Sequence, residues 1–130
     1  MIDKVAWILL RDGAVLSSRN RGRDVFYLPG GKREPGESDL ETLVREVREE
    51  LTVEIVSGSA AHLGTFKAAA HGQPPGTLVT MSCYTAGYAG DLRPDNEIEE
   101  IGWLRYADRD RVSAVDRLVF DHLHEQGQLR

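Results

Sequence analysis

The segment from Ser38 to Leu51 constrains the fold more than any other part of the sequence. Ser38 followed three positions later by Glu41 forms a capping box, and Asp39 places a negative charge in the first helical turn. Apolar residues then recur at helical spacing and predict a helix with one buried face: Leu40, Leu43, Val44, Val47 and Leu51. This segment is therefore the clearest helix in the chain.

Short strands are predicted on both sides of this helix. The strands expected before it are Val5 to Leu10, Ala14 to Arg19 and Val25 to Leu28, with a hairpin turn at Asp12-Gly13. Those expected after it are Val53 to Val56, Ala60 to Ala69, Thr77 to Ala89 and Ile101 to Leu104, with a loop over 71–76 and a closing helix from Asp108 to Gln126. This order predicts an α/β sandwich with a mixed sheet, in one domain over residues 1–130.

Composition narrows the class of partner. The formal net charge of −5 argues against non-specific binding of nucleic acid. No apolar run approaches the roughly 20 residues that span a bilayer, and the first residues lack the features of a signal peptide. The single cysteine, Cys83, excludes an internal disulfide framework and fits a reducing cytoplasm. We expect a cytoplasmic protein with a small-molecule partner and no membrane or nucleic-acid partner.

Three glutamates share one face of the predicted helix. Glu46 and Glu49 are three positions apart, and Glu46 and Glu50 are four apart, so their carboxylates lie on the same side. Like charges at these spacings cost an isolated helix roughly 0.2–0.5 kcal/mol per pair. A solvated face is the simpler explanation of these glutamates alone. The functional explanation is that the glutamates bind a hard divalent cation such as Mg²⁺, which takes carboxylate ligands and keeps coordination positions for water and phosphate.

The segment before the helix favours the functional explanation. Pro29-Gly30-Gly31 follows a predicted strand with a backbone free to approach a ligand, and a carbonyl there could complete a metal shell. Glu37 lies just before the cap, where an ion pair with Arg45 would hold the loop against the helix. The basic residues around this loop favour a polyphosphate ligand, with a solvated basic loop as the alternative: Arg19, Arg21, Arg23, Lys32 and Arg33.

The region from Gly31 to Val53 resembles the Nudix box of the MutT/Nudix hydrolase superfamily. Gly31, five residues, Glu37, seven residues, and then Arg45-Glu46-Val47-Arg48-Glu49-Glu50 match the pattern. The one departure is Thr52, where the family usually has glycine. Because a β-branched residue resists the left-handed conformation, we expect the helix exit to be built differently here. The order of strands and helices also resembles the family's α/β/α sandwich with a central mixed sheet.

The resemblance implies a Mg²⁺-dependent or Mn²⁺-dependent hydrolase. Glu46, Glu49 and Glu50 would hold the metal together with the carbonyl of Gly30, and either Glu49 or Glu50 is a candidate general base. Glu37 and Arg45 would support the geometry of loop and helix.

The resemblance also implies a further acid downstream of the box. Glu97, Glu99 and Glu100 all lie in an acidic stretch just before a predicted strand, and Glu97 is preferred among them, with a solvated acidic turn as the alternative. The candidate residues for substrate contact lie in or near the box: Arg19, Arg21, Lys32 and Gly31.

The substrate implied is a nucleoside diphosphate linked to another group, and a nucleoside triphosphate is preferred because the chain is short. The rival substrates are ADP-ribose and nucleotide sugars. An alternative of another class is a module that senses nucleotides without hydrolysing them, although such relatives usually lack some box carboxylates. Isomerisation of an isoprenoid diphosphate is weaker still, because Cys83 is the chain's one cysteine. The resemblance leaves the oligomeric state open, with a homodimer as one expectation.

Overall fold

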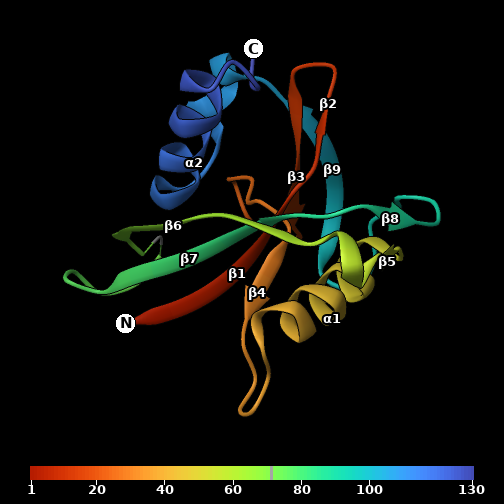
Figure 1. The fold of residues 1–130 in the computed structure, drawn as a ribbon. Helices are drawn as coiled ribbons and strands as arrows, with labels where there is room; N and C mark the ends of the chain where they lie inside the picture. The colour runs from red at the N-terminus through yellow and green to blue at the C-terminus, as the bar shows by residue number, and fades with distance from the viewer. Residues whose placement is uncertain (71) are drawn as a thin grey trace.

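The computed structural model describes residues 1–70 and 72–130, so the first residue of the loop predicted over 71–76 lies outside the described residues. Figure 1 shows the chain. The elements in order are β1 (Ile2–Ile8), β2 (Leu10–Arg11), β3 (Ala14–Asn20), β4 (Gly30–Lys32), α1 (Asp39–Leu51), β5 (Glu54–Ile55), the 3₁₀ turn η1 (Ser57–Ser59), β6 (Ala61–Ala69), β7 (Leu78–Thr85), β8 (Tyr88–Ala89), β9 (Ile98–Leu104), η2 (Tyr106–Arg111) and α2 (Ala114–Glu125).

The central sheet is mixed, as predicted. Its order is β4-β1-β7-β6, in which β1 runs parallel to β7 and the other neighbours are antiparallel. A second, antiparallel sheet has the order β2-β3-β9, and β5 pairs with β8. The turn between β2 and β3 has positive φ at both Asp12 and Gly13, which is the conformation that the Asp-Gly pair predicts for a two-residue hairpin loop.

The two helices cover opposite faces of the sheet (Figure 1). Strand β1 shows why, because successive side chains of a strand point to opposite faces. Val5 and Trp7 join the core that contains the apolar stripe of α1, whereas Ala6 and Ile8 join the core that contains the inner face of α2. The predicted α/β/α sandwich is confirmed.

Two sequence-based predictions around β4 are wrong. Residues Val25 to Leu28 form no strand, because Phe26 and Tyr27 make only isolated bridges, to Val112 and Ser18. The strand forms instead at Gly30–Lys32, where a loop was predicted. A Cβ on Gly30, whose φ is +145°, would lie 2.0 Å from the carbonyl oxygen of Val5, so only glycine lets this segment pair so closely with β1.

Further boundaries differ from the predictions, among them the start of β1 at Ile2 rather than Val5. The long strand predicted over Thr77 to Ala89 is two strands, because the chain leaves the central sheet after Thr85 and pairs with β5 from Tyr88. Between them the Ala86 carbonyl accepts the indole N–H of Trp7 at 3.0 Å. Strand β9 begins at Ile98 rather than Ile101, since Ile98 is buried and carries the strand into the core. The closing helix starts only at Ala114, since η2 occupies Tyr106–Arg111.

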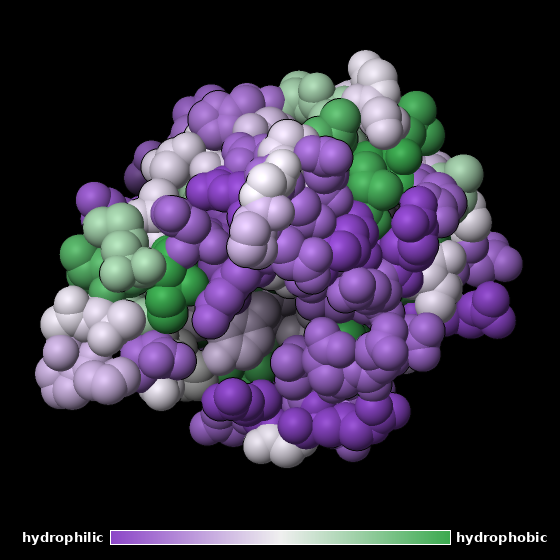
Figure 2. Space-filling model, turned by 90° about the horizontal axis from the view of Figure 1, so that it is seen from below, coloured by the Kyte–Doolittle hydropathy of each residue, from purple (hydrophilic) through white to green (hydrophobic). Residues whose placement is uncertain are grey.

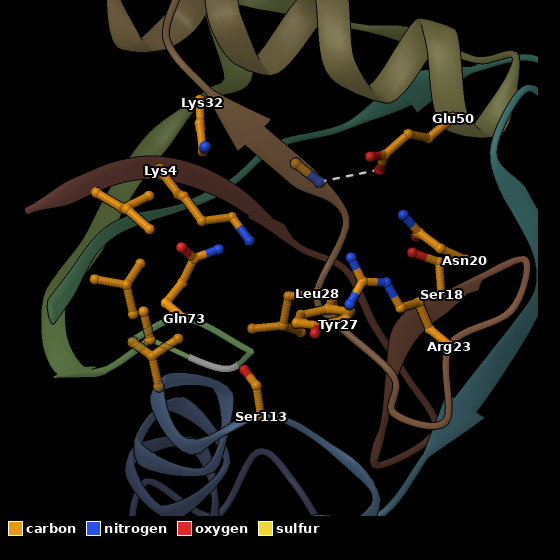
Figure 3. Close-up of a pocket in the computed structure, with 15 residues that line it drawn as sticks. Lys4, Ser18, Asn20, Arg23, Tyr27, Leu28, Lys32, Glu50, Gln73 and Ser113 are labelled. Carbon is orange, nitrogen blue, oxygen red and sulfur yellow. Dashed lines mark hydrogen bonds between the residues drawn. The ribbon is translucent and has the colours of Figure 1, made fainter. Parts of the chain in front are cut away.

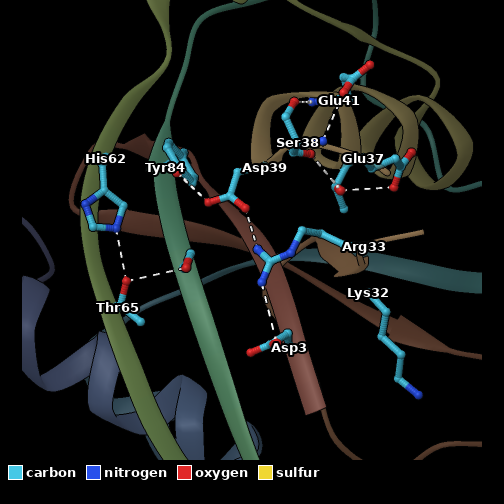
Figure 4. Close-up of polar contacts among 12 residues, drawn as sticks. Asp3, Lys32, Arg33, Glu37, Ser38, Asp39, Glu41, His62, Thr65 and Tyr84 are labelled. Carbon is cyan, nitrogen blue, oxygen red and sulfur yellow. Dashed lines mark hydrogen bonds and ion pairs between the residues drawn. The ribbon is translucent and has the colours of Figure 1, made fainter. Parts of the chain in front are cut away.

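The start of α1 has the predicted capping box. The Ser38 Oγ accepts the Glu41 N–H at 3.1 Å, and the Glu41 carboxylate accepts the Ser38 N–H at 2.9 Å. Asp39 accepts the Tyr84 hydroxyl at 2.6 Å and also pairs with Arg33, which ties the first turn to β7 and to the preceding loop (Figure 4).

Thr52 corrects the expectation for the helix exit. It adopts the left-handed conformation, with φ 62° and ψ 22°, that glycine normally takes at this position. The Thr52 N–H donates to the Arg48 carbonyl at 3.1 Å, and its Oγ1 donates to the Asp91 carbonyl at 3.2 Å. These bonds offset a conformational cost of roughly 1–2 kcal/mol.

Thr52→Val is expected to lower the free energy of unfolding by about 1 kcal/mol, because the strain stays and the bond to Asp91 is lost. Thr52→Gly loses the same bond but relieves the strain, so it should equal or exceed wild type. Urea denaturation of the three proteins tests this order. A Val variant as stable as wild type would show that the Oγ1 bond contributes nothing.

The large apolar side chains that are exposed among the described residues are Met1, Val56, Leu78 and Leu118. The face seen in Figure 2 is predominantly hydrophilic, with separate apolar spots and a hollow near its centre. In the described residues we find no helix whose length and apolar character would let it cross a membrane.

Candidate active site

Glu50 is a buried carboxylate in the last turn of α1. Only 6% of the residue is exposed, and its Oε1 accepts the Gly30 N–H at 3.1 Å (Figure 3). Burial raises the pKa of Glu50 to about 8, against the effect of the Gly30 N–H, and the charges of Glu46 and Glu97 raise it further. A helix selected only for stability would not bury this group, which indicates a function for it.

Glu46 lies one turn earlier against the backbone of β4. A Cβ on Gly31 would lie 2.5 Å from the Glu46 carboxyl carbon, so the glycine makes room for this carboxylate. Burial raises the pKa of Glu46, while its bond to Arg45 at 2.8 Å opposes that shift. Glu49 is exposed and its Oε2 lies 3.6 Å from Arg45 Nη1. The structure thus places the three predicted carboxylates on one side of α1, as their spacing implies.

Arg45 connects the loop, the helix and β4. Its Nε and Nη2 donate to the two Glu37 oxygens at 2.7 and 2.8 Å, and Nη2 also donates to the Lys32 carbonyl at 3.1 Å. The Glu37–Arg45 ion pair is therefore present, as the sequence suggested. The Arg45 guanidinium, helped by the N–H of Glu34, lowers the pKa of Glu37 to about 2. This bidentate pair holds the loop at the angle that brings β4 beside Glu46 and Glu50.

The downstream acids separate into two groups. Arg19 pairs with Glu99 and with Glu100, both at 2.8 Å, so these three side chains hold β3 to β9. Burial chiefly raises the pKa of Glu46 and Glu50, and the charge of Glu97 adds to the shift of both, so Glu97 lies close enough to act on them. Of the three candidates, Glu97 is therefore the one whose charge acts on both box carboxylates, while Glu99 and Glu100 are paired with Arg19.

A cavity of about 330 Å³ opens between the end of α1, the β1–β4 pair and the start of α2 (Figure 3). Glu50 lies on its wall, together with three basic side chains, Lys4, Arg23 and Lys32. Tyr27 and Leu28 form part of its apolar lining, and the Lys4 Nζ lies 5.2 Å from the centre of the Tyr27 ring. One carboxylate thus faces several cations across a space of the size that small ligands occupy.

Residues 2–123 match the family model described as the NUDIX domain. The chain belongs to this family. The CTP pyrophosphohydrolase of Escherichia coli (strain K12) is 42% identical to it over 62 residues, which are 45% of this chain and 46% of that protein. The chain therefore spans about half the length of the curated relative that it matches.

Solved structures share the fold of this NUDIX domain. The solution structure of the E. coli ORF135 protein has a TM-score of 0.76 and 25% identity, over 96% of this chain and 89% of that one. The crystal structure of the MutT protein from Methanosarcina mazei Go1 has a TM-score of 0.77 over 98% of this chain and 95% of that one. The latter is 23% identical, so it bears on the fold alone.

The carboxylates of this NUDIX domain fit a hard divalent cation in kind. They supply only oxygen ligands. A divalent cation would also offset the repulsion between the partly buried Glu46 and the buried Glu50. As the side chains stand, however, no three His, Cys, Asp or Glu residues in the described part of the chain are arranged to hold a metal. Arg45 instead pairs with Glu46 at 2.8 Å. Ligation by Glu46, Glu49 and Glu50 together would therefore require their carboxylates to move closer to one another.

The residues predicted to contact substrate lie in different surroundings, and some residues that line the cavity were not predicted. Arg19 lies in ion pairs and Arg21 binds the Asn96 carbonyl, whereas Lys32 lines the cavity and Gly31 packs against Glu46. Lys4 was missed because the first strand was predicted to begin at Val5. The alternation that includes Ile2, Lys4, Ala6 and Ile8 is the signal that could have found it, since a cation then falls on a buried face.

Ser113 and Asp116, at the start of α2, were also missed. Ser113 lines the cavity and donates its hydroxyl to Asp116 Oδ2 at 2.7 Å. Burial raises the pKa of Asp116 to about 6, against the Lys4 ammonium, and its Oδ1 has no hydrogen-bond partner among the described residues. No sequence signal marks these two residues, because their place is set by how α2 docks on the sheet.

Proposed function

We propose that this NUDIX-family chain hydrolyses a nucleoside triphosphate with Mg²⁺, which Mn²⁺ can replace, and releases pyrophosphate. The observation that carries the proposal is the buried Glu50 carboxylate on the wall of a cavity that also holds Lys4, Arg23 and Lys32. In the reaction, water adds to phosphorus, the bridging P–O bond breaks, and the water proton passes to a base.

The position of each residue in the site suggests its role in the proposed reaction. Glu46, Glu49 and Glu50, with the Gly30 carbonyl and Glu97, would hold the cation, which would neutralise the phosphates and lower the pKa of a bound water. Lys4, Arg23 and Lys32 would bind the phosphate oxygens. Either Glu49 or Glu50 would take the water proton. Arg45 and Glu37 contact no substrate in this proposal and position the loop and helix.

A cytosine nucleotide is the substrate that we propose to test first. The support is the likeness to the E. coli CTP pyrophosphohydrolase, which covers only part of each chain. The Tyr27 ring gives a cavity wall on which a base could stack, and a cavity of about 330 Å³ suits part of a nucleotide. We also propose a cytoplasmic location and a small-molecule substrate, in line with the net charge of −5.

Two alternative functions, another substrate class and a sensing module, are tested together with the proposed one. ADP-ribose or a nucleotide sugar would use the same carboxylates and a wider part of the cavity. A sensing module would bind a nucleotide and release nothing, but the box carboxylates Glu46, Glu49 and Glu50 are all present, which favours an enzyme.

The test is a panel of nucleoside triphosphates, ADP-ribose and a nucleotide sugar with Mg²⁺ or Mn²⁺, with pyrophosphate and phosphate measured separately. We expect CTP or its deoxy form to yield the monophosphate and pyrophosphate. Glu50→Gln should be inactive and Glu125→Gln, an exposed acid on α2, fully active. Binding of a nucleotide without any product, in either metal, would favour the sensing module instead.

A further inference from the structure

The loop between β8 and β9 is fastened to the C-terminal end of α1. The last carbonyls of a helix lack partners within it and need donors from elsewhere. Here the Leu51 carbonyl accepts the Arg93 N–H at 3.0 Å, the Glu50 carbonyl accepts the Asp95 N–H at 2.9 Å, and the Glu49 carbonyl accepts the Asn96 side-chain amide at 2.6 Å. Three consecutive residues at the helix end, two of them box carboxylates, are thus bound by one loop.

Asn96 is bound from both sides of this loop. It lies in the left-handed region, with φ 51°, which asparagine tolerates better than most residues. Its N–H donates to the Asp95 carboxylate at 2.8 Å, and its carbonyl accepts the guanidinium of Arg21. The Arg21 N–H in turn donates to the Glu97 carbonyl at 2.8 Å. The loop is therefore held between α1 on one side and the turn after β3 on the other.

Glu97 follows Asn96 directly in the chain. Its neighbours in β9, Glu99 and Glu100, are engaged by Arg19, so they are held away from the cavity carboxylates. Glu97 is exposed and makes no side-chain ion pair within 4.0 Å in the described part of the chain. Its position is thus set by the backbone that Asn96 and Arg21 hold.

We propose that Asn96 is a positioning residue, which fixes Glu97 beside the box carboxylates by binding the Glu49 carbonyl and, through its own carbonyl, Arg21. The proposal rests on the proposed function, in which Glu97 contributes to the metal site. The loop binds the carbonyls of Glu49, Glu50 and Leu51, so Glu97 follows directly after residues held against the end of the box helix, which supports this placement.

The experiment is a double-mutant cycle of Asn96→Gly and Glu97→Gln. Glycine keeps the left-handed backbone and removes only the amide that binds the Glu49 carbonyl. We expect Asn96→Gly to lower kcat for CTP roughly 10- to 100-fold with KM within about twofold, as a misplaced catalytic group does. In the Glu97→Gln background the same change should have less than about a twofold effect, because its target is already gone.

Thr52→Val is the matched control. It removes a different bond between the same helix end and the same loop, that of Thr52 Oγ1 to the Asp91 carbonyl, and leaves Glu97 held. Its kcat should equal that of wild type at a similar loss of stability. A kcat of Asn96→Gly equal to wild type, or an equal loss with and without Glu97, would overturn the proposal.

Mn²⁺ binding, measured calorimetrically without nucleotide, gives a readout independent of turnover. Asn96→Gly and Glu97→Gln should weaken Mn²⁺ binding to a similar degree and not additively, whereas Thr52→Val should not weaken it. If wild type hydrolyses no nucleotide, the proposed function fails and this cycle alone decides the role of Asn96. Additive losses, or no binding of Mn²⁺ by wild type, would refute it.

Discussion

Glu50→Gln is expected to abolish hydrolysis and, without metal, to make the protein more stable. The loss of activity should be at least roughly 10²-fold, because Glu50 is a proposed metal ligand and one of the two candidate bases. The gain in stability follows from burial, which raises the pKa of Glu50 from 4.5 to about 8. At neutral pH the chain must therefore either bury a charge or take up a proton when it folds, and both cost free energy. Glutamine is neutral and still offers an oxygen to the Gly30 N–H.

The pH dependence has a definite sign. Between about pH 4.5 and 8 the folded protein binds a proton at Glu50 that the unfolded chain has released, so stability falls as pH rises through this window. At pH 7 the cost is on the order of 3 kcal/mol, because each pH unit above the unfolded pKa adds about 1.4 kcal/mol. Wild type and Glu50→Gln should be closest in stability near pH 4.5 and farthest apart at pH 8.

Urea denaturation in EDTA at pH 5, 6, 7 and 8 measures this difference. Glu125→Gln serves as the control, because that acid is exposed on α2 and is not among the residues that line the cavity. A Glu50→Gln protein less stable than wild type at pH 8 would mean that burial of the carboxylate carries no net cost. Retained hydrolysis would mean that Glu50 takes no part in the chemistry.

Arg45→Ala is expected to lower both stability and activity. It removes the donors to Glu37, Glu46 and the Lys32 carbonyl, and it leaves Glu46 partly buried without its cation. Loss of charge-assisted bonds of this kind costs roughly 1.5–3 kcal/mol each, although partial exposure of Arg45 reduces the effect. With the loop no longer held to α1, kcat should fall roughly 100-fold while the fold persists.

Arg48→Ala is the matched control for Arg45→Ala. Arg48 lies on the same helix and pairs with Glu54 at 2.6 Å, but both side chains are more than half exposed. Such a pair contributes at most about 1 kcal/mol, and its loss should leave kcat unchanged. Arg45→Lys should recover part of the stability but little activity, because an ammonium cannot make the bidentate bond to Glu37.

The acid limb of the stability curve gives an independent check on Arg45. Glu37 has its pKa lowered to about 2, so its pairing stabilises the fold above about pH 4.5 and is lost as pH falls toward 2. Arg45→Ala should remove this dependence, whereas Arg48→Ala should remove only the smaller dependence that arises because Arg48 lowers the pKa of Glu54. Denaturation between pH 2.5 and 5 measures it. An unchanged acid limb in Arg45→Ala would show that Arg45 is not the cause of the lowered Glu37 pKa.

The helix of the box and its cap were predictable from sequence because their causes are local. A capping serine, its partner Glu41 and an apolar stripe at helical spacing act within a few turns, and so does the spacing that places Glu46, Glu49 and Glu50 on one side. The Asp12-Gly13 hairpin was predictable for the same reason. The ion pair of Glu37 with Arg45 was also within reach, because eight positions separate a loop end from a helix face.

Contacts distant in sequence decided what these rules missed. Val25 to Leu28 has the composition of a strand, but its neighbours in space allow only isolated bridges. Gly30–Lys32 forms a strand instead, because Gly30 lets its backbone approach that of β1 closely enough to pair with it. Thr52 takes a conformation that its side chain disfavours, because Arg48 and Asp91 supply compensating bonds. Tertiary contacts of this size override a local preference of about 1–2 kcal/mol.

The sequence by itself determined the family, the order of the elements and the carboxylates on the acidic face of α1, because short-range spacing encodes each of them. Only the tertiary structure decided which charges meet across the cavity. In the folded chain Arg19 pairs with Glu99 and Glu100, while Glu97 lies near the box. Lys4 and Glu50 line the same cavity. Burial and charge partners set the chemistry of these groups, and both depend on segments that meet only when the sheet and its two helices pack together.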